Sequence, residues 1–325
     1  MNKERLICAL RASPLWLSPA HFAFGQDISG AAGGVDVIWY WRKFGKTQEE
    51  ALAPGDCVSD YLRHAAPERR SPNLAFDEFW YRHEYPAVER LISEGKYRSA
   101  WEHYVAEGAR NYYNPAFWFD DRWYQRQHVE VASAVASRNL ICGFEHYLLY
   151  GVRQGFSPSI YFNAEWYRKN HMPEITAGVR SYPLVHYLLS ERKARACPVP
   201  FFDPQWYSIQ YGGYRPAEGG KPEVAPAYEH YMLFGRRLGN SPSPYFNEAA
   251  YREAYPEVVK QLTAGVYASG FEHYVTEGPA NGYLAPSHLG HGGVDYAGPA
   301  FLQSYEQSLR LHLSQLSELS ELMKL

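Results

Sequence analysis

The sequence predicts an all-α fold, a solenoid-like array of about six short helical repeats of about 43 residues, followed by a C-terminal amphipathic helix. Three observations lead to this prediction. A Phe-Asp-x-x-Trp-Tyr motif recurs along the chain, an aromatic-Glu-His-Tyr motif follows it, and a proline closes each unit. Because the motifs share one register and so small a unit cannot bury its apolar face alone, neighbouring units are expected to stack.

Composition limits the class of protein. The chain has 325 residues, of which 46% are hydrophobic, and this excludes a disordered protein. Its net charge of −3 argues against a dedicated nucleic-acid binder. No stretch of 18 apolar residues is present, so we expect no membrane span. Aromatic residues make up 16% of the chain, and the 28 tyrosines outnumber Phe and Trp together, which is unusual for an aliphatic core.

Residues 1–34 are interpreted as an N-terminal cap segment. Their apolar run, from Leu6 to Leu10, is too short for a secretory signal peptide, so we expect the protein to be made in the cytoplasm without one. The four cysteines show no C-x-x-C spacing and do not form a disulfide scaffold. We interpret them as small buried hydrophobic residues: Cys8, Cys57, Cys142 and Cys197.

The repeats span residues 35–286, and each begins at a helix N-cap. Asp and Asn occupy the second motif position in every copy, where their oxygen accepts free N–H groups of the first turn. From the first to the sixth repeat the caps are Asp36, Asp77, Asp120, Asn163, Asp203 and Asn247. The preceding Phe76 and the following Tyr81 have the spacing of a hydrophobic staple. Asp121 is expected to be an exposed residue at a helix start.

Each repeat continues with further short helices. We expect the first helix to stop at Tyr85-Pro86 and Tyr255-Pro256, and a second helix to begin at that proline. A third helix carries the His-Tyr motif. It is expected to end at a left-handed glycine in four repeats, at Gly108, Gly151, Gly235 and Gly278. The closing prolines are Pro72, Pro115, Pro158, Pro200, Pro242 and Pro286.

Residues 287–300 form a linker rich in Gly and His, and residues 301–325 have apolar residues at alternating spacings of three and four. This tail predicts an amphipathic or coiled-coil helix. Three roles stay open for it: docking on the array, contact with a protein partner or with another copy of the chain, and lying on a membrane surface.

The repeated histidine is the first candidate for chemistry: His103, His146, His186, His230 and His273. A catalytic role five times over is implausible. Helices that pack 8–10 Å apart cannot bring one histidine each to a tetrahedral metal site with bonds near 2 Å. We therefore expect no metal and no cofactor, and a structural histidine that bonds a neighbouring backbone or the capping Asp.

Aromatic residues outside the repeat pattern are the better candidates. They lie in connectors beside Asn, Arg, Gly and Pro, where exposed rings can stack on the apolar face of a sugar while polar neighbours bind its hydroxyls. The predicted carbohydrate-binding residues are Tyr112, Tyr113, Trp118, Tyr161, Tyr211, Tyr214 and Tyr245. Packing between repeats is the alternative role for these rings. Common phosphate-binding, zinc-protease and serine-hydrolase motifs are missing, so we expect no enzyme and no catalytic residues.

The combined pattern resembles a degenerate repeat of roughly 40 residues in bacterial proteins tied to surface polysaccharides, often fused to or encoded beside glycosyltransferases. The likeness covers about 250 of the 325 residues. The family's Asn-Pro-Asp-Val becomes Tyr-Pro-Ala-Val at 85–88 and Tyr-Pro-Glu-Val at 255–258, and it is lost in the third to fifth repeats. No glycosyltransferase domain is present, so the resemblance implies a link to cell-surface glycan and does not extend to catalysis.

These observations predict a non-enzymatic protein that binds a bacterial capsular polysaccharide. One setting is adhesion to host capsule by an oligomeric spike or fibre of a phage-like particle, released from the cell with that particle. The alternative is a cytoplasmic scaffold or accessory protein for glycosyltransferases that assemble polysaccharide. An unrecognised sugar-active enzyme is the third reading. Genome neighbourhood, with virion genes or glycosyltransferase genes, discriminates between the first two.

Overall fold

The structure is a computed structural model of the chain, and it describes residues 2–17, 34–45, 52–172, 178, 181–190, 196–212, 214–216, 222–224 and 227–288. These residues fall into two compact parts. The N-terminal part is Met1–Pro198 with Pro216–Lys221, and the C-terminal part is Val199–Arg215 with Pro222–Leu325. Most of the predicted linker and all of the predicted tail helix, 301–325, lie outside the described residues.

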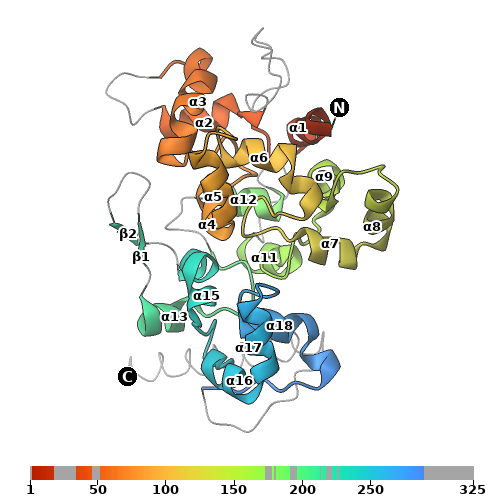
Figure 1. Ribbon diagram of the computed structural model, residues 1–325, viewed down its shortest axis with the longest axis vertical. Coiled ribbons are helices and arrows are strands. Elements are labelled where there is room, and N and C mark those ends of the chain that lie inside the picture. Colours follow the sequence, from red (N-terminus) through yellow and green to blue (C-terminus); the bar gives the residue numbers. More distant parts are fainter. Residues whose placement is uncertain are drawn as a thin grey trace, which may run out of the picture. The chain divides into compact units, whose positions relative to one another are not determined.

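The N-terminal part consists of short helices (Figure 1). Its α-helices are α1 (Asn2–Ala12), α2 (Val37–Phe44), α3 (Cys57–Glu68), α4 (Glu78–Glu84), α5 (Pro86–Ser93), α6 (Ala100–Ala106), α7 (Asp121–Gln127), α8 (Val129–Ala136), α9 (Gly143–His146), α10 (Val152–Gln154), α11 (Ala164–His171) and α12 (Pro183–Leu189). Between these helices lie the 3₁₀ turns η2 (Pro54–Asp56) and η3 (Gly108–Asn111) and the π-helix η4 (Tyr147–Gly151).

The C-terminal part has the same character. Its helices are α13 (Pro204–Tyr211), α14 (Ala227–His230), the π-helix η7 (Tyr231–Gly235), α15 (Arg236–Leu238), α16 (Glu248–Ala254), α17 (Pro256–Thr263), α18 (Gly270–Glu277) and the 3₁₀ turn η8 (Pro279–Asn281). Two three-residue strands, β1 (Tyr214–Pro216) and β2 (Pro222–Val224), pair with each other. The all-α class is confirmed, whereas the number of repeats and their stacking in one array stay predictions.

Helix α1 packs against α6, α9 and η4 within the N-terminal part (Figure 1). Its buried face carries Leu6, Ile7 and Leu10. Arg5 Nη2 lies 2.9 Å from Glu145 Oε1, which fixes the helix at its polar edge. The cysteines are all free thiols, and two of them, Cys57 and Cys142, are buried as predicted. The other two depart from the prediction: Cys8 is exposed and Cys197 is half-buried.

The six predicted N-caps are confirmed. Each capping side chain accepts a hydrogen bond from the backbone N–H three residues later, at 2.8 to 3.1 Å. The predicted staple is also present, because the Phe76 and Tyr81 ring centroids are 5.1 Å apart and those of Phe246 and Tyr251 are 5.2 Å apart. These local interactions start the first helix of each repeat at a fixed residue.

The capping residues also reach forward to the next repeat. The backbone N–H of each one donates to the carbonyl of a proline about one repeat later, at Pro72, Pro115, Pro158, Pro198, Pro242 and Pro286. Five of these prolines were predicted to close the repeats. The fourth prediction, Pro200, is wrong, because Asn163 donates to Pro198, two residues earlier. The segment Pro-Val-Pro offers both prolines, and Pro198 is the one with the spacing of the other repeats, five residues before the next capping residue.

Replacing Asp120 by alanine is expected to lower the free energy of unfolding by about 1 kcal/mol. The Asp120 carboxylate accepts from the Trp123 N–H at 2.8 Å, and alanine leaves that donor unbonded. Asp120→Asn is the matched control, because asparagine caps the fourth and sixth repeats. Urea unfolding measures both variants. Equal midpoints for wild type and Asp120→Ala would show that this cap does not contribute.

The predicted helix boundary at proline is confirmed in two repeats. Helix α4 ends at Glu84 and α5 begins at Pro86, and in the same way α16 ends at Ala254 and α17 begins at Pro256. A residue before proline avoids the helical region, and proline fits the first helical position, so one dipeptide both ends a helix and begins the next.

A buried carboxylate follows the cap in three repeats and links the first helix to the third. Glu78 accepts hydrogen bonds from the Ala100 and Trp101 N–H groups, at 2.7 and 3.2 Å. Glu248 does the same for Gly270 and Phe271, and Asp121 accepts from the Phe144 N–H. The expectation that Asp121 is exposed is therefore wrong: it is 2% exposed, because it binds the unbonded N–H groups at the start of α9.

The unfolding free energy is expected to depend on pH through Glu78. Burial raises the pKa of Glu78 to about 8, although two backbone N–H groups and Arg82 oppose the rise. A carboxyl with a raised folded pKa favours folding at low pH, and this contribution is lost as the pH rises through the folded value. Between about pH 5 and about pH 9 we expect wild type to lose on the order of 4 kcal/mol through this group.

The control for the pH series is Glu78→Gln, which has no proton to exchange. The difference in unfolding free energy between wild type and Glu78→Gln isolates Glu78 from histidines such as His103, whose pKa is lowered by burial and whose contribution has the opposite sign. A pH-independent difference would contradict a raised pKa at Glu78.

The predicted left-handed glycines are wrong by four residues. Gly151, Gly235 and Gly278 have φ of −59°, −58° and −53°, and Gly108 is also absent from the positive-φ residues. The left-handed residue lies four positions later, at Gly155 (φ 71°), Gly239 (φ 84°) and Gly282 (φ 76°). In the second and third repeats and in the C-terminal part, helical structure continues past the first glycine before the chain turns.

Candidate functional site

The repeated histidine pairs with the tyrosine of the first motif. The tyrosine Oη lies 2.9 or 3.0 Å from the histidine Nδ1 in five repeats: Tyr81 with His103, Tyr124 with His146, Tyr167 with His186, Tyr207 with His230, and Tyr251 with His273. The expected partner, a neighbouring backbone group or the capping Asp, is wrong. The true partner is a side chain from the first helix of the same repeat.

The glycine after the His-Tyr motif makes room for this pair. A Cβ on Gly108 would lie 2.4 Å from Tyr81 Oη, and one on Gly235 would lie 2.0 Å from Tyr207 Oη. Both distances are shorter than any real contact of a Cβ atom. The glycine is therefore required by the close approach of the hydroxyl, and its own backbone angles are ordinary.

The protonation states of Tyr81 and His103 suit a structural hydrogen bond. Tyr81 is fully buried, and burial raises its pKa well above the ordinary value, so the hydroxyl keeps its proton. Burial also lowers the pKa of His103, which favours the neutral imidazole. A neutral ring that carries its proton on Nε2 accepts at Nδ1, so the tyrosine donates. The Tyr81 hydroxyl therefore uses its proton in the hydrogen bond to His103, and Gly108 packs closely against its oxygen.

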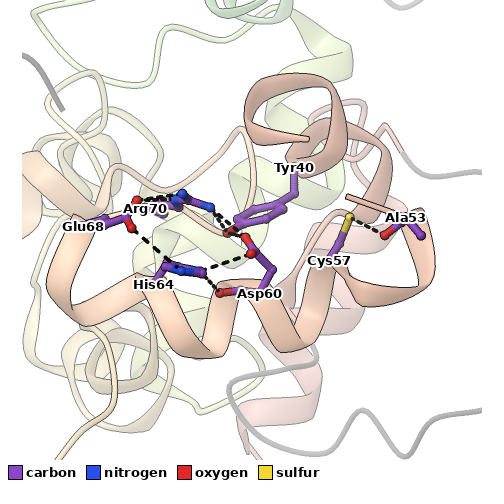
Figure 2. Close-up of polar contacts among 7 residues, drawn as sticks. All are labelled: Tyr40, Ala53, Cys57, Asp60, His64, Glu68 and Arg70. Atoms are coloured by element: carbon purple, nitrogen blue, oxygen red, sulfur yellow. Dashed lines mark hydrogen bonds and ion pairs between the residues drawn. The ribbon is translucent and has the colours of Figure 1, made fainter. Parts of the chain in front are cut away.

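The first repeat replaces the histidine with an acid. Figure 2 shows the Tyr40 hydroxyl and the Arg70 guanidinium converging on the Asp60 carboxylate. Both contacts to Asp60 Oδ2 are 2.7 Å long, and Arg70 also pairs with Glu68 at 2.7 Å. His64 lies between the two acids, 3.1 Å from Asp60. Asp60 is buried, so Arg70 supplies the charge that the neutral histidine of the other repeats does not need.

A further aromatic position was missed by the sequence reasoning. The residue four places after the motif tyrosine is aromatic in every repeat: Phe44, Tyr85, His128, His171, Tyr211 and Tyr255. Its ring packs on the motif tyrosine, with centroids 4.5 to 5.0 Å apart. Three of the tyrosines also accept a backbone N–H from the following connector. The i, i+4 spacing was the available signal.

The seven predicted binding aromatics divide into buried and exposed residues. Trp118 and Tyr161 are 2% and 3% exposed, so the expectation that their rings face solvent is wrong. Tyr113 is half-buried, with its ring centroid 4.5 Å from that of Tyr85, and Tyr245 is half-buried too. Tyr211 is 37% exposed but belongs to the repeat pattern. Tyr214 lies in β1, and its side chain is outside the described residues.

Tyr112 is the residue of this set that combines exposure with an unusual backbone. It is 41% exposed, and its φ of 59° is left-handed. We call this position, eight residues after the tyrosine of the His-Tyr motif, the corner. The described corners are Arg69, Tyr112, Gly155, Gly239 and Gly282, all with positive φ. Tyr112 places a large ring in solvent at a position where three repeats have glycine.

The side chain at each non-glycine corner contacts the next repeat. Arg122 Cζ lies 4.5 Å from the centroid of the Tyr112 ring, and Arg69 Cζ lies 5.7 Å from that of Phe79. Phe79 and Arg122 both stand two residues after a capping Asp. Both corners therefore make a cation–π contact with the next repeat. At the first, the corner residue Arg69 supplies the charge, and at the second, the corner residue Tyr112 supplies the ring. Arg69 also pairs with Glu89, 3.6 Å away.

The described residues contain neither a metal-binding cluster nor a membrane-spanning helix. No group of three or more His, Cys, Asp or Glu side chains is placed there to hold a metal ion. Within the same residues no helix is long and apolar enough to cross a membrane. Comparison of the chain with protein-family models, curated proteins and solved structures found no match.

Proposed function

We propose that the chain is a non-catalytic helical-repeat protein that binds a bacterial surface polysaccharide, of the capsular class, through aromatic side chains at exposed corners. The observation that carries the proposal is Tyr112. A non-glycine residue in the left-handed region costs roughly 1–3 kcal/mol, and such residues concentrate at ligand-binding sites. Glycine at the equivalent positions of other repeats avoids this cost. A tyrosine at this position is therefore explained if its exposed ring binds a ligand.

The chemistry around Tyr112 supports a sugar as the ligand. The C–H face of a pyranose packs on an aromatic ring, while polar neighbours bind the hydroxyl groups. Asn111 and Arg110 precede Tyr112, and both are exposed. In the C-terminal part Tyr211 offers a second partly exposed ring. Weak contacts of this kind gain affinity when several act on one long polymer.

The setting belongs to the proposal as well. We place the protein in a spike or fibre of a phage-like particle, oligomeric through residues 301–325, which adheres to host capsule. A polymer with thousands of identical sugars suits many weak contacts, and copies of the chain would multiply them.

Retention on immobilised polysaccharide tests the proposal. The full-length chain is passed over a panel of purified capsular polysaccharides, and the size of each polymer is measured before and after incubation. We expect retention on at least one polymer with its length unchanged. Shortened polymer would replace the proposal with an enzyme. Absence of retention, together with co-purification of a glycosyltransferase from cells, would favour the scaffold instead.

A further inference from the structure

We propose that the corner formed by Tyr112 and Arg122 selects sugars that carry a carboxylate. This inference rests on the proposed polysaccharide binding and names the substrate class of the same site. It starts from two neighbouring residues: a tyrosine at a corner where three repeats have glycine, and an arginine at the variable position two residues after the cap of the third repeat.

The first step is that Arg122 holds an uncompensated charge. Its side chain is exposed and lies over the Tyr112 ring, and within the described residues no acidic side chain pairs with it. The adjacent acids are engaged elsewhere. Asp120 accepts from the Trp123 N–H at 2.8 Å. Asp121 is buried and binds the Phe144 N–H and the Gln125 amide. Arg69 at the first corner differs, because Glu89 pairs with it.

The second step is that the Tyr112 ring orients the Arg122 guanidinium. A guanidinium has five N–H donors in a rigid fork that matches the two oxygens of a carboxylate. Contact with the Tyr112 ring, at 4.5 Å, restricts the side chain before any ligand arrives, so less conformational entropy is lost on binding. The guanidinium lies over the Tyr112 ring, and Tyr112 as a whole is 41% exposed. A sugar that stacks there can place an acidic substituent against Arg122.

The third step separates a sugar acid from a nucleic-acid phosphate, which also combines a stacking face with negative charge. Binding of a nucleic-acid strand relies on many cationic contacts along the backbone. The chain has 32 Lys and Arg against 35 Asp and Glu, and the exposed arginines of this corner are Arg122 and Arg110, the latter two residues before Tyr112. Two charges next to one exposed ring fit one acidic sugar residue better than a run of phosphates.

The test uses polygalacturonate and the same polymer after chemical reduction of its carboxylates. Both are immobilised, and the affinity of the full-length chain is measured on each. We expect wild type to bind polygalacturonate about tenfold more tightly than the reduced polymer, which corresponds to one charge-assisted bidentate contact. Arg122→Gln should lose that preference. Arg126→Gln, at an exposed arginine of the same helix α7, keeps the net charge equal and should behave as wild type.

Each outcome has a distinct meaning. Equal affinity of wild type for the two polymers, or an Arg122→Gln variant that retains the preference, overturns the acidic-sugar proposal while polysaccharide binding stands. An equal loss in Arg126→Gln reduces the effect to net charge and overturns it too. Tighter retention on single-stranded oligothymidylate would assign the corner to nucleic acid. No retention on either polymer also overturns it, and the capsular panel then decides the broader function separately.

Discussion

Trp118→Ala is expected to lower the free energy of unfolding by about 3–5 kcal/mol. Trp118 is 2% exposed, and its ring lies 6.1 to 6.2 Å, centroid to centroid, from the rings of Phe119, Phe144 and Tyr147. Alanine would leave a cavity among these rings, because the backbone of the connector is fixed by hydrogen bonds such as that from the Ser159 hydroxyl to the Trp118 carbonyl.

Urea unfolding followed by far-ultraviolet circular dichroism measures this loss. Trp118→Phe is the partial control and should cost less than alanine, because it keeps an aromatic ring in the core. If Trp118→Ala unfolded at the wild-type urea concentration and instead lost polysaccharide binding, the ring would belong to a surface site and its burial in this core would be contradicted.

Gly108→Ala is expected to lower the free energy of unfolding by about 1–3 kcal/mol, in the range of overpacked cores. The new methyl group would lie 2.4 Å from Tyr81 Oη, an atom held by its hydrogen bond to His103 in a buried setting. Gly55→Ala is the matched control, because no atom lies within 4 Å of its added Cβ, and we expect it to change stability by less than about 0.5 kcal/mol.

A second variant separates the clash from other effects of alanine. Tyr81→Phe removes the hydroxyl oxygen and loses the hydrogen bond, while the Gly108→Ala/Tyr81→Phe pair removes the clash as well. The double variant should therefore be more stable than the sum of the two single losses predicts. Strict additivity in a double-mutant cycle would show that the glycine is not needed for the tyrosine hydroxyl.

Local signals in the sequence predicted the helix starts and stops. A capping Asp, the following Trp-Tyr pair and the Tyr-Pro boundary act within a few residues, so their outcome at Asp77 and Tyr85-Pro86 depends little on the rest of the fold. The buried Asp121 and the close approach at Gly108 were missed for the opposite reason. They are set by contacts with residues more than twenty positions away, which periodicity does not reveal.

The candidate site was predicted only in part. Aromatic residues in connectors all look alike in the sequence, so Trp118, a core residue, and Tyr112, an exposed one, were placed in one set. Their difference is a matter of burial and of backbone angle, since Tyr112 occupies the left-handed corner. Alignment of the repeats on the corner, rather than on the glycine four residues earlier, would have shown Tyr112 opposite glycines.

Binding of polysaccharide by Tyr112→Gly, measured beside its thermal unfolding, tests the central claim most directly. Glycine already occupies three equivalent corners, so relief of the left-handed strain should offset the lost ring contact and hold the unfolding free energy within about 1 kcal/mol of wild type. Tyr150→Ala, at another exposed tyrosine, is the control. We predict that Tyr112→Gly alone weakens binding about tenfold, using the scale of ring stacking on bases. Unchanged binding by a stable Tyr112→Gly protein would contradict the account.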